Sequence, residues 1–458
     1  MNDNAAAFYA ARDQRTAQLG ASYDALCRPV SLVIGADAAA SRPGQAAALA
    51  TVNMLARVHR QLHIAVPSIA RIAAGLIPAD DLAGSIRETA LAINPHITVT
   101  LSDAMDEIQD AVTAGIGSEV PAGLDVYGGW TGGRGEIGDR PFPLTGDEPG
   151  LIGAATATNL LAAAIFRASH QAPVRSIRLN IMEGRTGESA GTTSVAGPID
   201  VGRVLVAGAG AVAQALLYWA RETGVTGTWT IMDGDLCKLH NTNRCLGMTA
   251  ADAGWPGGTP GGTEAPKAKV AAALTAAVPY PGWYDEWAET EASRPDLILP
   301  LANERSVRAL IAGRGEPVLL HATTSPNWSA QLHRHIPELD DCPACRFPDD
   351  AEPVVSCSAG PARPEKPTSG DAALPFVSSM AGLLLATALL SLNSAHPLLD
   401  EMDNHWQIDL AMPASPWMAS RHLPVNCPHK LGAPTRTRVY QLQPRRWDRH
   451  AWPQPTGH

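Results

Sequence analysis

Residues 203–244 read RVLVAGAGAVAQALLYWARETGVTGTWTIMDGDLCKLHNTNR, and the fold is predicted from the pattern of these residues. An apolar strand over residues 203–207 leads into the turn GAGAVA at residues 208–213, and a helix follows over residues 211–223. A second strand comes next, at residues 228–232. This order, with G-x-G-x-x-A spacing in the turn, predicts a βαβ unit whose helix N-terminus binds a nucleotide phosphate.

Each small residue of the turn has its own predicted role. Gly208 allows the tight turn, Gly210 lets the backbone approach a phosphate, and Ala213 keeps the helix close to the strand. Asp233 ends the second strand, where an acidic side chain hydrogen-bonds a ribose. These features suit NAD as well as ATP, and a glycine turn that serves packing alone is the alternative.

The polar residues after the second strand favour ATP over NAD. Asp235, Asn241 and Arg244 follow it directly, and Lys267 comes after a loop rich in Gly and Pro at residues 253–266. Amides and fixed positive charge suit a triphosphate, because negative charge builds on the phosphates during transfer. A nicotinamide has no such need. The alternative is a polar surface loop followed by a lysine at a helix start.

Asp-x-Asp, five residues, Asn-x-x-Arg and a later Lys resemble the signature of ubiquitin-activating-type adenylyltransferases, the ThiF/MoeB-like family with bacterial members. The resemblance covers about residues 203–429. It implies ATP-dependent adenylation of the C-terminal carboxylate of a small ubiquitin-like protein, with Mg²⁺ as a cofactor. Thioester formation and transfer to a conjugating partner would follow, and the resemblance also allows a homodimer.

The resemblance assigns roles to individual residues. Asp233 would bind the ribose, Asn241 and Arg244 would bind phosphates, and Lys267 would reach the phosphates during catalysis. Lys269, in the same PKAK segment, is the alternative to Lys267.

Two positions depart from the family pattern. Cys245 follows Arg244 where the family has Gln, and Ala302 stands where the family has a Mg²⁺-binding Asp. The following Asn303, assigned to the nucleotide site, is present. Asp235 or Glu304 would have to replace the missing acid. Without a replacement, the chain would be a non-catalytic scaffold that keeps the fold.

Cys342 and Cys345 form a Cys-x-x-Cys pair, whose thiolates can bind one metal ion together. The family closes its zinc site with a second such pair about 80 residues later. Here Cys427 and His429 stand at that distance, which implies a structural Zn²⁺ held by three cysteines and one histidine. A metal-free reduced pair and a redox motif are the alternatives.

Cys357, in VVSCSAG, is the candidate nucleophile. Relatives carry a cysteine at this spacing, and a thiolate near an acyl adenylate can attack it. The alternative is a small buried side chain. Cys237 and Cys245 are further candidates for the same role. The HRH at residues 333–335 is interpreted as a solvent-exposed strand face.

The first half of the chain predicts a related unit. Strand, helix and strand patterns follow one another over residues 28–67, with the helix at residues 45–59, and a further helix is expected at residues 151–170. The glycine-dense residues 128–150 between them are interpreted as a loop. Residues 183–197 are interpreted as a linker.

The turn after the first strand of this half is degraded to Gly35-Ala36-Asp37, with an acid where a phosphate would lie. It resembles the inactive adenylation domain that pairs with an active one in ubiquitin-activating enzymes. In such pairs the N-terminal helix lends an arginine to the partner's ATP. Arg15 is assigned that catalytic role and Arg12 is the alternative; a solvated arginine would explain either equally well.

These features predict an α/β protein with two Rossmann-like parallel-sheet domains that are divergent copies of one fold. A degenerate domain spans residues 1–195, and a nucleotide-binding domain spans residues 196–458. The second contains a crossover loop at about residues 346–375 and the zinc region. The rival functions are an NAD-type dinucleotide-binding oxidoreductase and a non-catalytic scaffold.

Composition limits the surroundings of the protein. A net charge of −10 argues against nucleic-acid and anionic-membrane partners. The apolar residues 377–392 are too few for a membrane span and predict a buried helix. Seven cysteines suit a reducing compartment, and the polar start MNDNAAAFYAARDQR does not resemble a secretory signal. Cytoplasm is the predicted location.

Overall fold

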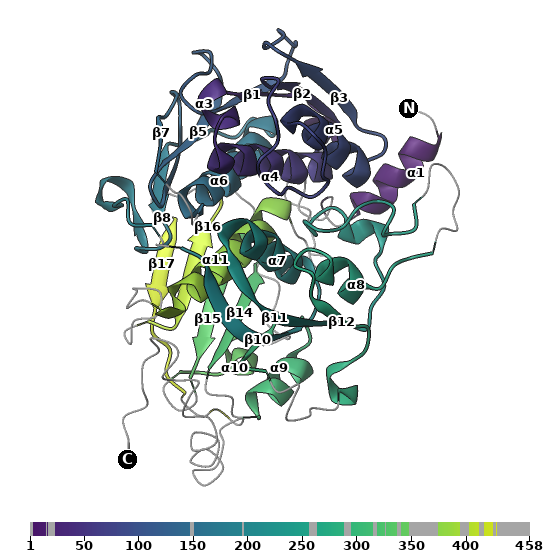
Figure 1. Cartoon of the computed structure of the whole chain (residues 1–458), viewed down its shortest axis with the longest axis vertical. Helices are drawn as coiled ribbons and strands as arrows, with labels where there is room; N and C mark the ends of the chain where they lie inside the picture. Colours follow the sequence, from purple (N-terminus) through teal and green to yellow (C-terminus); the bar gives the residue numbers. More distant parts are fainter. Residues whose placement is uncertain are drawn as a thin grey trace.

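Apolar strands form two β-sheets, one from each half of the chain, and helices connect many of the strands (Figure 1). The first half, in purple and blue, lies above the second half, in teal, green and yellow. The computed structural model describes residues 3–14, 16, 23–146, 151–194, 197–255, 263–287, 295–314, 318–325, 327–336, 340–347, 374–393, 403–411, 416–424 and 427.

The first sheet has the strand order β3-β2-β1-β4-β5-β6-β8-β9, and β7 pairs with β5. Its strands are β1 (Val30–Ile34), β2 (Gln61–Ala65), β3 (Thr98–Ser102), β4 (Val112–Ile116), β5 (Val126–Thr131), β6 (Arg134–Gly138), β7 (Leu144–Thr145), β8 (Ile177–Asn180) and β9 (Arg185–Thr186). The helices of this half are α1 (Asp3–Arg12), α2 (Tyr23–Cys27), α3 (Ala36–Ala39), α4 (Arg42–Val58), α5 (Leu82–Ile93) and α6 (Ile152–Ser169).

The second sheet has the order β12-β11-β10-β13-β14-β15-β16-β17. Its strands are β10 (Ile199–Ala207), β11 (Val225–Met232), β12 (Val278–Tyr280), β13 (Leu297–Pro300), β14 (Leu319–Thr324), β15 (Ser329–His335), β16 (His405–Asp409) and β17 (Trp417–Ser420). Its helices are α7 (Ala211–Thr223), α8 (Lys267–Ala272), α9 (Arg305–Ala312), α10 (Pro343–Arg346) and α11 (Pro375–Leu390).

The two sheets share one topology. When β1 is matched with β10, the strand orders agree along their whole length. In both sheets the first four pairings are parallel and the last three are antiparallel. The helices agree as well, since α4 and α7 follow the first strand and α6 and α11 precede the last two. The α/β class and the duplication are confirmed, with mixed and mostly parallel sheets. The domain boundary at residues 195–196 stays a prediction.

The glycine-dense residues 128–150 are largely strand, so the prediction of a loop was wrong. They contain most of β5 and all of β6 and β7. The glycines serve helix packing: a Cβ on Gly135 would lie 2.5 Å from the backbone nitrogen of Ala157 in α6, and one on Gly128 would lie 3.1 Å from Leu161. A helix at this distance leaves room for glycine alone.

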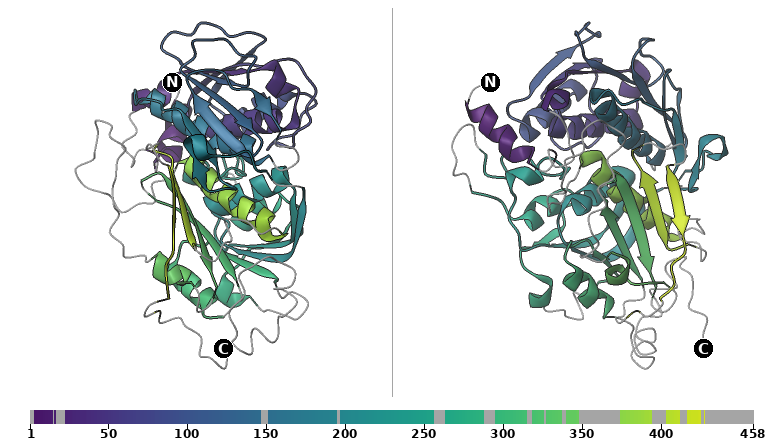
Figure 2. Two further views of the ribbon diagram at one scale, coloured as in Figure 1. Left: turned by 90° about the vertical axis from the view of Figure 1, so that its left-hand side faces the viewer. Right: turned by 180° about the vertical axis from the view of Figure 1, so that it is seen from behind.

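The apolar segment predicted as a buried helix is α11, and all of its residues are buried. It packs against α7 of its own half and against α6 of the other half. Figure 2 shows it in light green between the two halves. Among the described residues, no helix combines the length and apolarity needed to cross a membrane.

Gly382 of α11 gives a test of this packing. A Cβ there would lie 2.4 Å from the backbone nitrogen of Leu216 in α7, so the two helix backbones touch. We expect Gly382→Ala to lower the free energy of unfolding by roughly 2–3 kcal/mol, because the helices must separate. Gly313→Ala is the matched control. Its Cβ would meet its nearest atom at 3.4 Å, and its φ of −67° suits alanine. Equal urea midpoints for the two variants would contradict the close packing.

Candidate nucleotide site and cysteine cluster

The glycine turn lies between the end of β10 and the start of α7, and β11 and β13 flank β10 in parallel. Gly208 has φ +102°, and a Cβ there would lie 2.6 Å from the backbone nitrogen of Ala302. Gly210 is the N-cap of α7, and a Cβ there would meet no atom within 4 Å. Gly208 is therefore required by the fold, whereas Gly210 faces open space at a helix N-terminus.

Asp233 follows β11 and joins two loops. Its Oδ2 accepts a hydrogen bond from the backbone N–H of Ala209 at 2.7 Å, and its Oδ1 accepts one from Asp235 at 2.8 Å. Burial raises the pKa of Asp233, while the charge of Lys267 opposes the rise. Each carboxylate oxygen has a second lone pair. Asp233 can therefore accept further hydrogen bonds, for example from ribose hydroxyls.

Lys267 and Asp235 form an ion pair beside Asp233. The Lys267 Nζ lies 2.6 Å from the Asp235 Oδ2, and the backbone N–H of Lys267 donates to the Asp235 carbonyl at 2.9 Å. Burial by itself lowers the pKa of Lys267, but the hydrogen bond that Lys267 donates to Asp235 and the charge of Asp233 outweigh it and raise the pKa. Lys267 is therefore charged at neutral pH. Three of the predicted site residues meet here at the edge of the glycine turn.

Asn241 and Arg244 lie on the next loop, which begins with η3 (Leu239–Asn241). The Asn241 Oδ1 accepts a hydrogen bond from the backbone N–H of Lys238 at 3.0 Å. The Arg244 Nη1 donates to the His240 carbonyl at 2.9 Å and to the Asn243 Oδ1 at 3.0 Å. Both side chains hold their own loop in order, and their predicted contacts with phosphates stay predictions.

A buried arginine that the sequence did not single out holds the turn after β13. The Arg308 side chain donates to the carbonyls of Ala302 at 3.1 Å, Asn303 at 2.6 Å and Phe347 at 2.9 Å. Asn303 itself is exposed. Arg308 thus links the predicted nucleotide site to the cysteine cluster through Phe347, two residues after Cys345. The signal in the sequence was weak, because one arginine in a short helix is usually solvated.

Cys342, Cys345 and Cys427 come together from distant parts of the chain. The Cys427 sulfur lies 3.6 Å from each of the other two, and the three sulfurs lie within 4.8 Å of one another. Metal–sulfur bonds of about 2.3 Å in a tetrahedron separate the sulfurs by about 3.8 Å. The cluster therefore fits a metal ion. His429, the predicted fourth ligand, lies outside the described residues.

Three other predictions concern residues that the structure does not describe. They are the predictions for Cys357, for Arg15 and for most of the crossover loop at residues 346–375. The role of Arg12 toward ATP stays a prediction. Arg12 is described and buried, and its helix α1 contacts η3. Arg12 donates to the carbonyls of Ala56 at 3.2 Å and Val58 at 3.3 Å, within its own half of the chain.

The two cysteines near the glycine turn are poor nucleophiles. Cys237 and Cys245 are both buried. Burial raises the pKa of Cys237 to about 12 and also raises the pKa of Cys245. A thiol attacks as its thiolate, so burial and the raised pKa make both side chains less reactive than a solvent-exposed cysteine. Their place in the fold is a small apolar cluster with Met248 and Val270.

In the first half, an acid fills the turn that corresponds to the glycine turn. The Asp37 carboxylate accepts hydrogen bonds from the backbone N–H of Ala38 at 3.0 Å and from the N–H and hydroxyl of Ser118, each at 2.8 Å. A Cβ on Gly35 would lie 2.5 Å from the Asp37 Oδ1. As expected from the sequence, a carboxylate lies where a phosphate would bind.

The HRH segment is buried, so its interpretation as an exposed strand face was wrong. β15 lies inside the sheet, between β14 and β16. The His333 Nε2 lies 2.9 Å from the Asp341 Oδ1, and the Arg334 Nε donates to the Asp340 Oδ2 at 3.0 Å. Burial lowers the pKa of His335 to about 4. These polar side chains join β15 to the segment that carries the cysteines.

Comparisons with solved structures return partial likenesses. The crystal structure of Escherichia coli MccB with selenomethionine-labelled MccA shares 13% identity at a TM-score of 0.33. MccB with ATP shares 13% identity at a TM-score of 0.31, and selenomethionine-labelled PaaA shares 12% identity at a TM-score of 0.30. Each match covers 49% of this chain and 65% of the other, so the chain spans slightly less than two thirds of these proteins.

No protein-family model matches the chain, and no curated protein is similar enough in sequence to match it. The structural likenesses are too distant to transfer an activity. The function proposed below therefore depends on the geometry of the site.

Alanine substitutions at the two glycines of the turn are expected to change stability by very different amounts. We expect Gly208→Ala to lower the free energy of unfolding by roughly 3 kcal/mol, because its backbone is left-handed and its Cβ would meet the Ala302 backbone. Gly210→Ala should change it by less than about 0.5 kcal/mol, since the added methyl group enters open space. Urea unfolding followed by circular dichroism measures both. A destabilised Gly210→Ala would show that the turn is closed.

Proposed function

We propose that this protein is an ATP-dependent adenylyltransferase that activates the C-terminal carboxylate of a small ubiquitin-like protein. The observation that carries the proposal is the Lys267 ammonium, held 2.6 Å from Asp235 and beside Asp233 at the glycine turn. A cation next to a ribose-binding acid suits the triphosphate of ATP. An NAD-type oxidoreductase would give this cation no part in the reaction.

In the proposed reaction, a carboxylate oxygen of the carrier attacks the α-phosphate of ATP. The bond between the α-phosphate and pyrophosphate breaks, and an acyl adenylate remains. Gly210 supplies open backbone at the helix N-terminus for a phosphate, and Asp233 binds the ribose. Lys267 and Arg244 offset the charge that builds on the leaving pyrophosphate, and Asn241 orients the same group.

Mg²⁺ would be held by oxygen ligands, which it prefers. Ala302 offers no carboxylate, so another acid has to serve. Asp235 fits best, because its side chain is 55% exposed and its partner Lys267 can turn to the phosphates when ATP binds. Glu304, exposed at the start of α9, is the second acid near the turn after β13.

The ubiquitin-like carrier follows from the family resemblance. In this scheme Cys357 takes the acyl group as a thioester and passes it to a conjugating partner. Cys357 is preferred to Cys237 and Cys245 for that step, because burial raises the pKa of both of the other thiols.

An ATP–pyrophosphate exchange assay with candidate ubiquitin-like carriers tests the activity. We expect the wild-type protein to exchange label with its cognate carrier and Lys267→Ala to lower the rate roughly 100-fold, because a charge at the transition state is lost. Lys269→Ala, two residues along the same helix, should keep most of the activity. The reverse pattern would assign the phosphate role to Lys269.

Two results would contradict the proposal. Tight NAD binding without ATP binding would favour the oxidoreductase. ATP binding without exchange in the presence of a cognate carrier would favour the non-catalytic scaffold, for which Ala302 is the reason.

The cysteine cluster is proposed to hold a structural Zn²⁺, because thiolates favour this ion. We expect about one zinc per chain by elemental analysis, and little in Cys342→Ser. Cys27→Ser is the control, since Cys27 lies in α2, outside the cluster. The Cys342→Ser variant should also unfold at a lower temperature, because metal binding contributes to folding. Equal zinc contents in the two variants would contradict the assignment of a zinc ion to the cysteine cluster.

A further inference from the structure

One fully buried arginine of the first half enters the loop that carries Asn241 and Arg244. Arg57 lies near the end of α4, and its guanidinium donates to carbonyls in residues 241–248, here called the Asn241 loop. Its Nη1 donates to Thr242 at 2.6 Å and to Met248 at 3.0 Å, and its Nη2 donates to Leu246 at 2.8 Å. One side chain therefore joins three points of a loop that lies almost 200 residues further along the chain.

The geometry of these bonds closes the Asn241 loop. A single nitrogen, Nη1, binds the carbonyls of Thr242 and Met248, which stand on either side of Arg244. The loop's own backbone bonds are few and local, such as those from the N–H groups of Arg244 and Cys245 to the Asn241 carbonyl, both at 3.1 Å. Without the guanidinium, the buried carbonyls of Thr242 and Met248 would lose this donor, which is costly.

Asn53 fixes the arginine in turn. Its Oδ1 accepts a hydrogen bond from the Arg57 Nε at 2.9 Å, and its Nδ2 donates to the Leu246 carbonyl at 3.1 Å. Burial lowers the pKa of Arg57 to about 9, so the guanidinium still carries its proton at neutral pH. A lysine cannot replace this planar group with several fixed donors.

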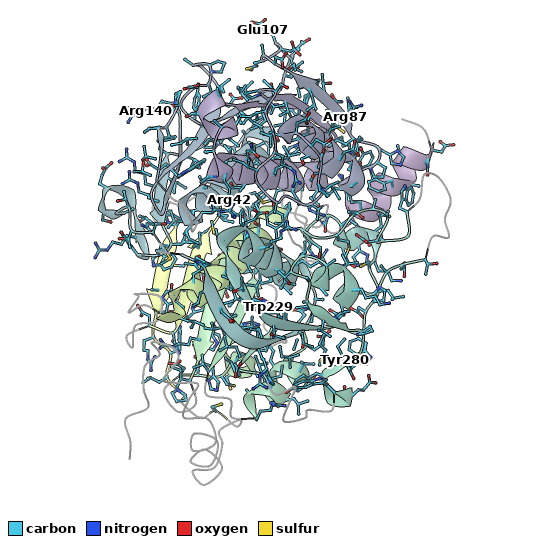
Figure 3. The ribbon with its side chains drawn as sticks, in the orientation of Figure 1. Arg42, Arg87, Glu107, Arg140, Trp229 and Tyr280 are labelled. Carbon is cyan, nitrogen blue, oxygen red and sulfur yellow. The ribbon has the colours of Figure 1, made fainter. Side chains whose placement is uncertain are left out.

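A corresponding contact runs in the other direction, from the second half to the first. The end of α7 meets the loop after β2: the Glu222 Oε1 accepts from the backbone N–H of Gly75 at 3.0 Å, and Arg221 donates to the Gly75 carbonyl. Arg42, labelled in Figure 3 at the junction of the halves, donates to the Glu222 carbonyl at 2.5 Å. The contact made by Arg57 differs because the loop it reaches carries predicted phosphate ligands.

We propose that Arg57 is a positioning residue, by which the half whose own turn is filled by Asp37 fixes Asn241 and Arg244 for ATP. The inference rests on the proposed function. It assigns the first half an indirect part in nucleotide binding, exerted through the backbone of the second half. It also predicts that ATP affinity depends on a residue that does not touch ATP.

Two variants and a matched control test this role. Arg57→Lys keeps the charge but loses the forked donors, and Asn53→Ala removes the acceptor that orients Arg57. Arg71→Lys is the control: Arg71 donates to the carbonyls of Ala79 at 2.8 Å and Ala74 at 2.6 Å, so it closes a loop in the same way within the first half. All three are compared with the wild type by amide hydrogen exchange and by ATP–pyrophosphate exchange.

We expect the amides of residues 241–248 to exchange at least tenfold faster in Arg57→Lys, less so in Asn53→Ala, and at the wild-type rate in Arg71→Lys. The KM for ATP should rise roughly tenfold or more in Arg57→Lys, since a small displacement of binding groups costs up to about 100-fold. The KM for the carrier should stay unchanged. A general loss of stability would not separate the two substrates in this way.

The outcomes separate this inference from the function on which it rests. No ATP exchange in the wild type would overturn the proposed function and the inference with it. Exchange in the wild type with an unchanged KM for ATP in Arg57→Lys would overturn the positioning role alone, whether or not the Asn241 loop had loosened.

Discussion

The close contact between the backbones of α11 and α7 constrains the rest of the structure. Gly382 has no side chain at the crossing, so α7 and α11 pack directly against each other, and both helices also contact the sheet. The N-terminus of α7 is Gly210, and the direction of this helix sets where its free N–H groups point. The same α11 packs against α6 of the other half. One buried helix therefore holds both the candidate site and the junction of the halves.

The two halves have the same topology but differ at the turn that follows the first strand of each. The turn after β10 is open at Gly210, whereas the turn after β1 is filled by the Asp37 carboxylate. The first half has kept its contacts with its neighbour, and Arg57 reaches from α4 into the loop after β11. The half whose turn is filled therefore still contributes a side chain to the proposed site of the other half.

Local signals in the sequence predicted the elements that depend on local forces. The helix at residues 211–223 has the predicted bounds, because its end is set by Gly224 in a left-handed conformation. The strands at residues 128–138 were missed, since their glycines are required by close packing against α6, which is a tertiary contact. Burial of His333 depends on the order of strands in the sheet, and the partners of Arg57 are carbonyls distant in the chain. Neither the burial nor these hydrogen bonds can be predicted from the residues next to them in the sequence.

The filled turn of the first half has a consequence for competition between ligands. Asp37 is part of the chain, so its carboxylate is present at an effective concentration that is independent of dilution. An anion from solution would have to displace it from Ser118 and Ala38 and leave a carboxylate without partners. The Asp37 turn therefore contains a permanent internal competitor, and of the two corresponding turns the one at Gly210 is open to an anion from solution.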